Sequence, residues 1–138
     1  MKKIQKIPAL IIMLIIFGFG GNNSYAQQVP AKLTQAFQAG DADGMAPFFN
    51  DRFQLTLLGV DHRVSQAQAK EIIRDFFKKY PPTSFEIMFK GDKKDSNFAV
   101  GKFKSKSETF RVNLFFKKVG EESLLHLLEI EKDNGSAF

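Results

Sequence analysis

The chain has two histidines, the side chains best suited to acid–base chemistry near neutral pH. His62 follows Asp61 in a predicted turn before the main helix, where an Asp–His pair could act as an oriented general base. Adjacent residues rarely align as such a dyad, and no Ser or Cys nucleophile has an evident place beside them. We therefore interpret both as polar loop residues and assign no catalytic residue.

His126 lies on the last predicted strand, on a face that would also carry Leu124, Leu128 and Ile130. A polar group among apolar side chains is the usual design of a small-ligand site. The alternative is a core or surface histidine satisfied by hydrogen bonds. Glu129 would fall on the opposite face of the strand. With two His and no Cys in the chain, we expect no metal and no other cofactor.

Lysines gather near the predicted hairpins and on one strand. They could form an anion-binding strip, but a solvated face with edge-protecting lysines is more typical. No basic-aromatic motif of an RNA-binding module is present. The residues are Lys93-Lys94, Lys117-Lys118, Lys102, Lys104 and Lys106.

Residues 1–26 have the pattern of a secretory signal peptide. Lysines open the segment, an almost wholly apolar run follows over 7–19, and small residues Ser24 and Ala26 precede Gln27. An uncleaved membrane anchor is the alternative, but the apolar run is shorter than the roughly 20 residues that a span needs. The absence of Cys excludes a lipoprotein anchor. We expect an exported protein, periplasmic or secreted, with no stable membrane span after cleavage.

One domain over 27–132, with a flexible tail over 133–138, accounts for the remaining chain. The leader holds three of the 20 basic residues and none of the 15 acidic ones, which leaves 17 basic against 15 acidic residues. A nearly neutral domain gives little electrostatic support for nucleic-acid binding. Of the 16 Phe, 14 lie in the mature domain, where they could fill a core, line a pocket or face a partner.

Hydrophobic periodicity and turn residues predict an α+β domain with a long helix on a curved antiparallel sheet. Ser65 and Gln68 have capping-box spacing at the start of that helix, and Pro81-Pro82 ends it. The predicted helices cover 30–39, 41–49 and 66–80, and the predicted strands cover 52–58, 63–64, 84–89, 98–105, 108–118 and 124–131.

This order resembles the cone-shaped nuclear-transport-factor-2-like (cystatin-like) fold, shared with ketosteroid isomerases and polyketide cyclases. The sequence is closer to an exported bacterial family of that fold, known mainly from Bacteroidetes and catalogued as a domain of unknown function. The segments that carry the resemblance are 37–42 (FQAGDA), 49–52 (FNDR), 65–69 (SQAQA), 75–82 (DFFKKYPP) and 110–112 (FRV).

The resemblance implies a test of isomerase chemistry, residue by residue. Ketosteroid isomerases use a Tyr and two acids inside the cone. The strand segment 53–58 here has no carboxylate, the first helix has no Tyr, and the mature domain's only Tyr is Tyr80. These departures argue against isomerase activity.

Two groups of residues follow as candidate sites. For a ligand pocket inside the cone the candidates are Phe37, Phe53, Phe76, Phe110, Leu114 and His126. For a homodimer interface on the other sheet face they are Met88, Phe103, Phe115, Leu125 and Leu127, together with Ala99. A register change at Gly101, or coverage by the tail, is the alternative to an exposed face.

We therefore interpret the chain as an exported, non-catalytic binding or interaction module. Its ligand would be a small apolar molecule in the cone, or a protein partner. The alternatives are an isomerase- or cyclase-type enzyme that uses the cone pocket, and a structural homodimer with a filled cone.

Overall fold

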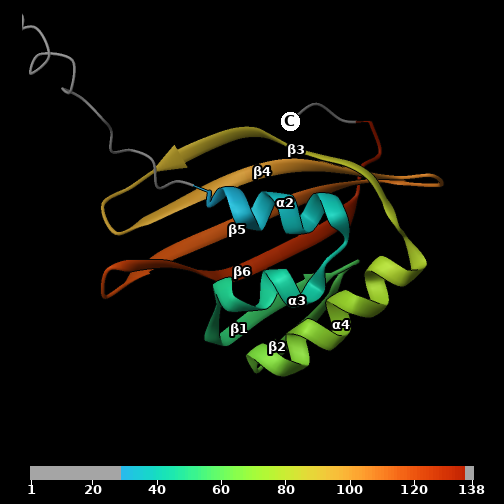
Figure 1. Ribbon diagram of the computed structural model, residues 1–138. Helices are drawn as coiled ribbons and strands as arrows, with labels where there is room; N and C mark the ends of the chain where they lie inside the picture. Colours follow the sequence, from blue (N-terminus) through green and yellow to red (C-terminus); the bar gives the residue numbers. More distant parts are fainter. Residues whose placement is uncertain (1–28, 136–138) are drawn as a thin grey trace, which may run out of the picture.

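The computed structural model describes residues 29–135, so the predicted signal peptide and the end of the predicted tail lie outside the described residues (Figure 1). In chain order the elements are α2 (Ala31–Ala39), α3 (Ala42–Met45), the 3-10 helix η3 (Ala46–Phe48), β1 (Phe49–Leu57), β2 (Val60–Val64), α4 (Gln66–Lys79), β3 (Pro82–Asp92), β4 (Ser96–Ser105), β5 (Thr109–Val119) and β6 (Glu122–Lys132). None of these helices has the length and hydrophobicity to span a bilayer.

The strands form one six-stranded sheet in the order β2-β1-β6-β5-β4-β3. β1 runs parallel to β6, and the other neighbours are antiparallel. The sheet is curved, and α2, α3 and α4 lie on one side of it (Figure 1). The predicted α+β class is confirmed. The parallel contact of β1 with β6 had no signal in the local sequence, because it joins segments far apart in the chain.

Local capping fixes both ends of the main helix. The Ser65 hydroxyl accepts a hydrogen bond from the backbone N–H of Gln68 at 3.2 Å, and the Gln68 side chain accepts one from the Ser65 N–H at 3.1 Å. The predicted capping box is therefore confirmed. Tyr80 follows the helix, and Pro81 prevents its continuation.

Three predicted boundaries differ from the structure. The second helix ends as α3 at Met45 and continues only as the 3-10 turn η3, which contains Pro47. β1 then starts at Phe49, three residues before the predicted strand. β2 begins at Val60, so Asp61 and His62 lie on a strand and not in a turn. Neighbouring residues of a strand point to opposite faces, so this pair does not form a dyad.

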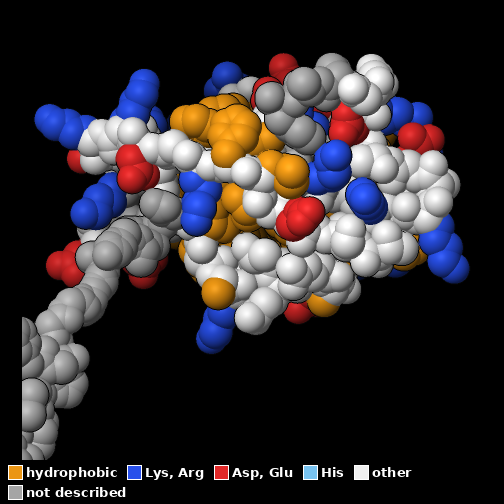
Figure 2. Space-filling model, turned by 90° about the horizontal axis from the view of Figure 1, so that it is seen from above, with side chains coloured by type: hydrophobic (Ala, Val, Ile, Leu, Met, Phe, Trp, Pro, Cys, Tyr) orange, Lys and Arg blue, Asp and Glu red, His pale blue; other side chains and the backbone are white. Residues whose placement is uncertain are grey.

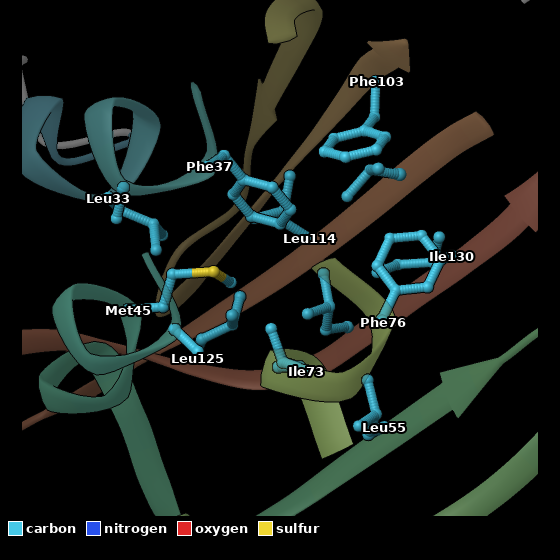
Figure 3. Close-up of a cluster of buried hydrophobic side chains, with 14 of the residues drawn as sticks. Leu33, Phe37, Met45, Leu55, Ile73, Phe76, Phe103, Leu114, Leu125 and Ile130 are labelled. Atoms are coloured by element: carbon cyan, nitrogen blue, oxygen red, sulfur yellow. The ribbon is translucent and has the colours of Figure 1, made fainter. Parts of the chain in front are cut away.

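Aromatic rings fill the space between the helices and the sheet (Figure 3). The Phe37 ring stacks on Phe85 with centroids 4.4 Å apart, and Phe76 contacts Phe103 at 5.6 Å and Phe110 at 5.2 Å. In residues 29–135 no polar or charged residue is buried. The core is therefore held by apolar burial and ring packing alone.

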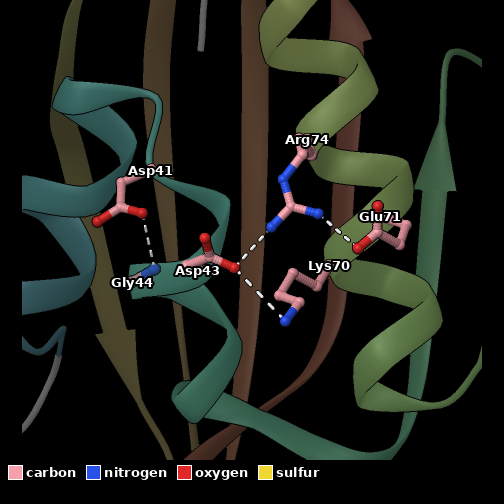
Figure 4. A network of polar contacts seen from close by, with 6 residues as sticks. All are labelled: Asp41, Asp43, Gly44, Lys70, Glu71 and Arg74. Carbon is pink, nitrogen blue, oxygen red and sulfur yellow. Dashed lines mark hydrogen bonds and ion pairs between the residues drawn. The ribbon is translucent and has the colours of Figure 1, made fainter.

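A surface cluster of charges ties α3 to α4 (Figure 4). The Asp43 carboxylate lies 2.6 Å from the Arg74 guanidinium and 3.4 Å from the Lys70 ammonium, and Arg74 also donates to Glu71. The hydrogen bond from Arg74 lowers the pKa of Glu71 below its ordinary value of 4.5. Because all these groups are solvated, the cluster orients α3 on α4 more than it stabilises the fold.

Gly101 lies on β4 directly beneath the ring of Phe85. A Cβ at this position would come 2.7 Å from Cε1 of Phe85 and 3.1 Å from the Glu86 carbonyl oxygen. The glycine therefore makes room for a ring of the neighbouring strand β3. The predicted register change does occur at Gly101, since Ile87 pairs with Gly101 and Phe89 pairs with the adjacent Val100, so the extra residue, Met88, lies on β3.

Replacing Gly101 by Ala is expected to destabilise the domain by about 1–3 kcal/mol, because the new methyl group would overlap the Phe85 ring. Chemical denaturation followed by circular dichroism measures this free energy of unfolding. In the double variant with Phe85→Leu the smaller side chain leaves room for the methyl group, so the two losses should not add. Strictly additive losses would show that the ring and the glycine are independent.

Candidate functional site

An extra residue in β6 decides which side chains reach the outer face of the sheet, the face away from the helices. Phe115 of β5 pairs with Leu127, and the next residue, Phe116, pairs with Leu125. His126 is left without a partner on β5, which is a β-bulge. The register between β1 and β6 also shifts here, between Phe49 and Gln54 of β1.

The bulge breaks the alternation that the sequence prediction assumed. Leu125 and Leu128 are both buried, at 0% exposure, although they are three residues apart. His126 and Leu127, between them, line a groove on the outer face. The prediction that His126 shares a face with Leu128 and Ile130 is therefore wrong.

The predicted interface set is divided between the two faces of the sheet. Phe103, Leu125 and Ala99 are in the core, against the prediction, because β4 pairs Phe103 with Phe110 and the bulge turns Leu125 inward. Met88 and Phe115 are exposed, at 44% and 38%.

Most of the predicted pocket residues belong to the packed core. Phe37, Phe53, Phe76, Phe110 and Leu114 are each at most 5% exposed. His126 lies on the far side of the sheet from the helices, so the structure does not bring the six residues around one cavity. Phe53 and His126 both line the outer groove.

The floor of the groove is a row of cross-strand neighbours. Phe98 of β4 pairs with Phe115, Phe115 with Leu127, Leu127 with Gln54, and Gln54 with Arg63 of β2. The row thus crosses five adjacent strands. The Phe98 and Phe115 ring centroids are 6.3 Å apart.

Gly91 supports one end of this row. A Cβ there would come within 2.3 Å of the Phe98 ring, so only glycine lets the ring lie across β3. Phe89 contacts the other side of Phe98 at 6.1 Å, edge to face. Hydrophobic side chains also gather visibly on one side of the molecule, with Lys and Arg around them (Figure 2).

The groove has a volume of about 890 Å³. Besides the floor row, its lining includes Phe53, Phe116 and the start of α4. The lining residues are Asp51, Arg52, Phe53, Gln54, Arg63, Val64, Ser65, Gln68, Lys93, Ser96, Asn97, Phe98, Phe115, Phe116, Lys117, His126 and Leu127.

Positive charge surrounds this apolar floor. The lining contains four cations, Arg52, Arg63, Lys93 and Lys117, against one acid, Asp51. On the same face Arg111 is paired with Glu131 at 3.5 Å. Within the described part of the chain, none of the four groove cations has a carboxylate within 4.0 Å.

The groove combines an apolar floor with cationic side chains. The His126 Nδ1 lies 3.4 Å from the Leu124 carbonyl oxygen, and no acid or nucleophile of residues 29–135 is hydrogen-bonded to the ring. Across residues 29–135 no group of three His, Cys, Asp or Glu could hold a metal ion. The arrangement can bind a molecule with an apolar body and can supply cations to it.

Sequence reasoning missed the groove residues Gln54, Arg52, Arg63 and Phe98 as a set. Each sits in an ordinary alternating strand pattern, and no local motif marks it. These residues are brought together by the cross-strand register and by the bulge at His126. The sequence does not reveal that bulge, because His126 also fits a strand that alternates regularly.

Comparison with known proteins identifies the chain's relatives. Residues 30–131 match the family model DUF4783, described as a domain of unknown function. No curated protein matches the chain. The crystal structure of a DUF4783 family protein from Bacteroides ovatus ATCC 8483 is 29% identical, with a TM-score of 0.76, covering 79% of this chain and 99% of that one.

More distant structures show the fold alone. A protein of unknown function with a cystatin-like fold from Nostoc punctiforme is 13% identical, with a TM-score of 0.60, covering 75% of this chain and 72% of that one. A nuclear-transport-factor-2-like protein of unknown function from Shewanella baltica is also 13% identical, with a TM-score of 0.61, covering 76% and 88%. The predicted fold and family resemblance are confirmed.

Leu127 and Leu128 form a matched pair for testing the assignment of faces. Leu128→Asp should destabilise the domain by about 4 kcal/mol, because it places an unpaired carboxylate in a core position that is 0% exposed. Leu127→Asp should cost about 1 kcal/mol, because its side chain faces the open groove. Urea denaturation of both variants measures the difference, and equal losses would contradict the bulge.

Proposed function

Because this chain belongs to the DUF4783 family, a domain of unknown function, we propose its function from its own geometry: it is a non-catalytic binding module. The bound molecule is small and largely apolar, and it lies in the outer groove. The observation that carries the proposal is the apolar floor of Phe98, Phe115 and Leu127 at the bottom of a concave site. Its volume falls in the range of about 300–1,000 Å³ typical of small-molecule sites.

The cone interior supports this choice of site over the cavity expected from the sequence. Phe76 touches Phe110 at 5.2 Å and Phe103 at 5.6 Å, and Phe77 stacks on Phe103 at 5.8 Å. Rings at these distances are in ordinary packing contact. A ligand inside the cone would have to displace them, whereas the outer groove is already open.

The lack of positioned proton carriers favours binding over an isomerase or cyclase. General acid–base catalysis needs a donor or acceptor held within hydrogen-bond reach of the substrate. In the described part of the chain the buried residues are all apolar, and His126 is the only imidazole in the groove. The enzyme alternative therefore has no pair of groups to carry it.

Two exposed side chains favour a second candidate, a homodimer formed through the outer face. Met88 and Phe89 are each 44% exposed. Large apolar side chains that gather on a surface commonly mark an interface. A second copy seated there would compete with a small molecule for Phe115.

The proposed place of action is outside the cytoplasm, in the periplasm or beyond. The support is the pattern of 1–26, with lysines, an apolar run and small residues before Gln27. Binding of apolar molecules suits such a location, because these compounds need a carrier or a receptor in water.

Nile red, an uncharged apolar dye, should bind the purified domain with a rise in fluorescence. Phe115→Gln is expected to weaken binding about tenfold or more, because it removes a large part of the apolar floor. Met88→Gln is the matched control, since Met88 is similarly exposed but does not line the groove. It should leave the affinity unchanged.

Two outcomes would contradict this proposal. Equal weakening by both variants would mean that the dye binds around the exposed side chains Met88 and Phe89 and not in the groove. Exclusion of the dye from a dimer, with the mass taken from light scattering of the same sample, would favour the homodimer. Circular dichroism of both variants checks that they remain folded.

Export can be tested with the full chain in a bacterial host that has two membranes. We expect the periplasmic fraction to contain a protein whose intact mass corresponds to a chain that begins at Gln27. Ala26→Glu should leave the precursor uncleaved, because the position before the cleavage site needs a small residue, while Ala26→Ser should be processed normally. An uncleaved wild-type chain in the cytoplasm would overturn the proposed location.

A further inference from the structure

We infer that the groove is selective for a single-chain carboxylate, with the carboxylate held by Arg63 and Arg52 and the chain lying across Leu127, Phe115 and Phe98. This inference rests on the proposed function, because it names the chemical class of the molecule bound in the same groove. It is carried by three observations: the charge of the lining, the direction of the floor row and the position of the two arginines.

The lining has an excess of positive charge with no internal partner. Four cations stand against one acid, and within residues 29–135 none of the four has a carboxylate within 4.0 Å. On the same face of the sheet Arg111 is paired with Glu131 at 3.5 Å. An anion in the groove would therefore complete a set of charges that the protein leaves open.

The floor has a direction, apolar at one end and cationic at the other. The row runs from Phe98 through Phe115 and Leu127 to Gln54, and ends at Arg63. Neighbouring strands lie about 4.8 Å apart, so the row extends over roughly 19 Å. A row of this length, one side chain wide, suits an extended hydrocarbon chain better than a compact ring system.

Arginine at the polar end favours a carboxylate. The guanidinium is planar and can donate two parallel hydrogen bonds to the two oxygens of one carboxylate. Arg63 pairs with Gln54, and Arg52 lines the same groove two residues before Gln54. The side-chain amide of Gln54 can add a further donor between the arginines.

The first turn of α4 adds to the positive potential at this end. Ser65 and Gln68, which cap the helix, both line the groove next to Arg63 on the chain. The start of a helix carries a partial positive charge from its aligned peptide dipoles. Lys117 lies two residues after Phe115 on β5, and Lys93 lies in the turn between β3 and β4, so both line the part of the groove around the phenyl rings and not the part at Arg63.

The test compares three probes with the same linear tail: decanoate, 1-decanol and decyltrimethylammonium, each below its micelle concentration. Their affinities are measured by displacement of Nile red from the mature domain. Decanoate should bind roughly tenfold more tightly than decanol, the gain expected from charge-assisted hydrogen bonds. Added salt should weaken the binding of decanoate and leave the binding of decanol unchanged.

Arg63→Gln and Lys117→Gln are the matched variants, because each removes one exposed cation from opposite ends of the groove. Arg63→Gln should abolish the preference for decanoate over decanol, with decanol binding unchanged. Lys117→Gln should keep most of the preference. Thermal melts of both variants exclude a loss of folding.

The outcomes separate this inference from the proposed function. If decanoate and decanol bind equally, or decyltrimethylammonium binds best, the carboxylate assignment is overturned while the binding function stands. If none of the probes binds, the proposed function fails and this inference fails with it. Equal loss of preference in both variants overturns the placement of the carboxylate at Arg63.

Discussion

The packing of phenyl rings between three helices and one sheet is the constraint on which the rest of the structure depends. A phenyl ring has no polar atom, so it contributes to the fold only by burial and by contact with other rings. Phe37, Phe76 and Phe103 meet on the concave side of the sheet, and no polar group of the described residues joins them there. The strands must therefore present apolar side chains inward along a curved surface, and glycine at 101 makes this possible beneath Phe85.

Curvature of this kind requires irregular strands, and the irregularities build the groove. The extra residue in β6 lets both Leu125 and Leu128 face the core. The bulge turns His126 and Leu127 outward, and the register of β1 against β6 also shifts beside it. The groove thus depends on how the core is filled, and a change that removed the bulge would alter both.

The helices could be predicted from local sequence signals. Which side chains lie on each face of the sheet depends on contacts between segments far apart in the chain. The Ser65–Gln68 capping box and Pro81 gave the limits of α4 to within a residue. Leu125 was assigned to the wrong face because strict alternation has no place for a bulge. Phe103 was assigned to the wrong face although β4 alternates regularly against β5, because alternation alone does not say which of the two faces is buried. The groove could not be predicted at all, since its five floor residues come from five strands whose register is set by tertiary packing.

The parallel pairing of β1 with β6 has a consequence for how the domain acquires its fold. β1 and β2 reach the other strands of the described sheet only through β6, the last of them in the chain. The two parts of the sheet therefore remain separate until nearly the whole domain has been synthesised. Contacts between such distant segments carry a loop-closure cost and slow folding. A chain shortened before Glu122 would thus lack the strand that joins β1 and β2 to β5.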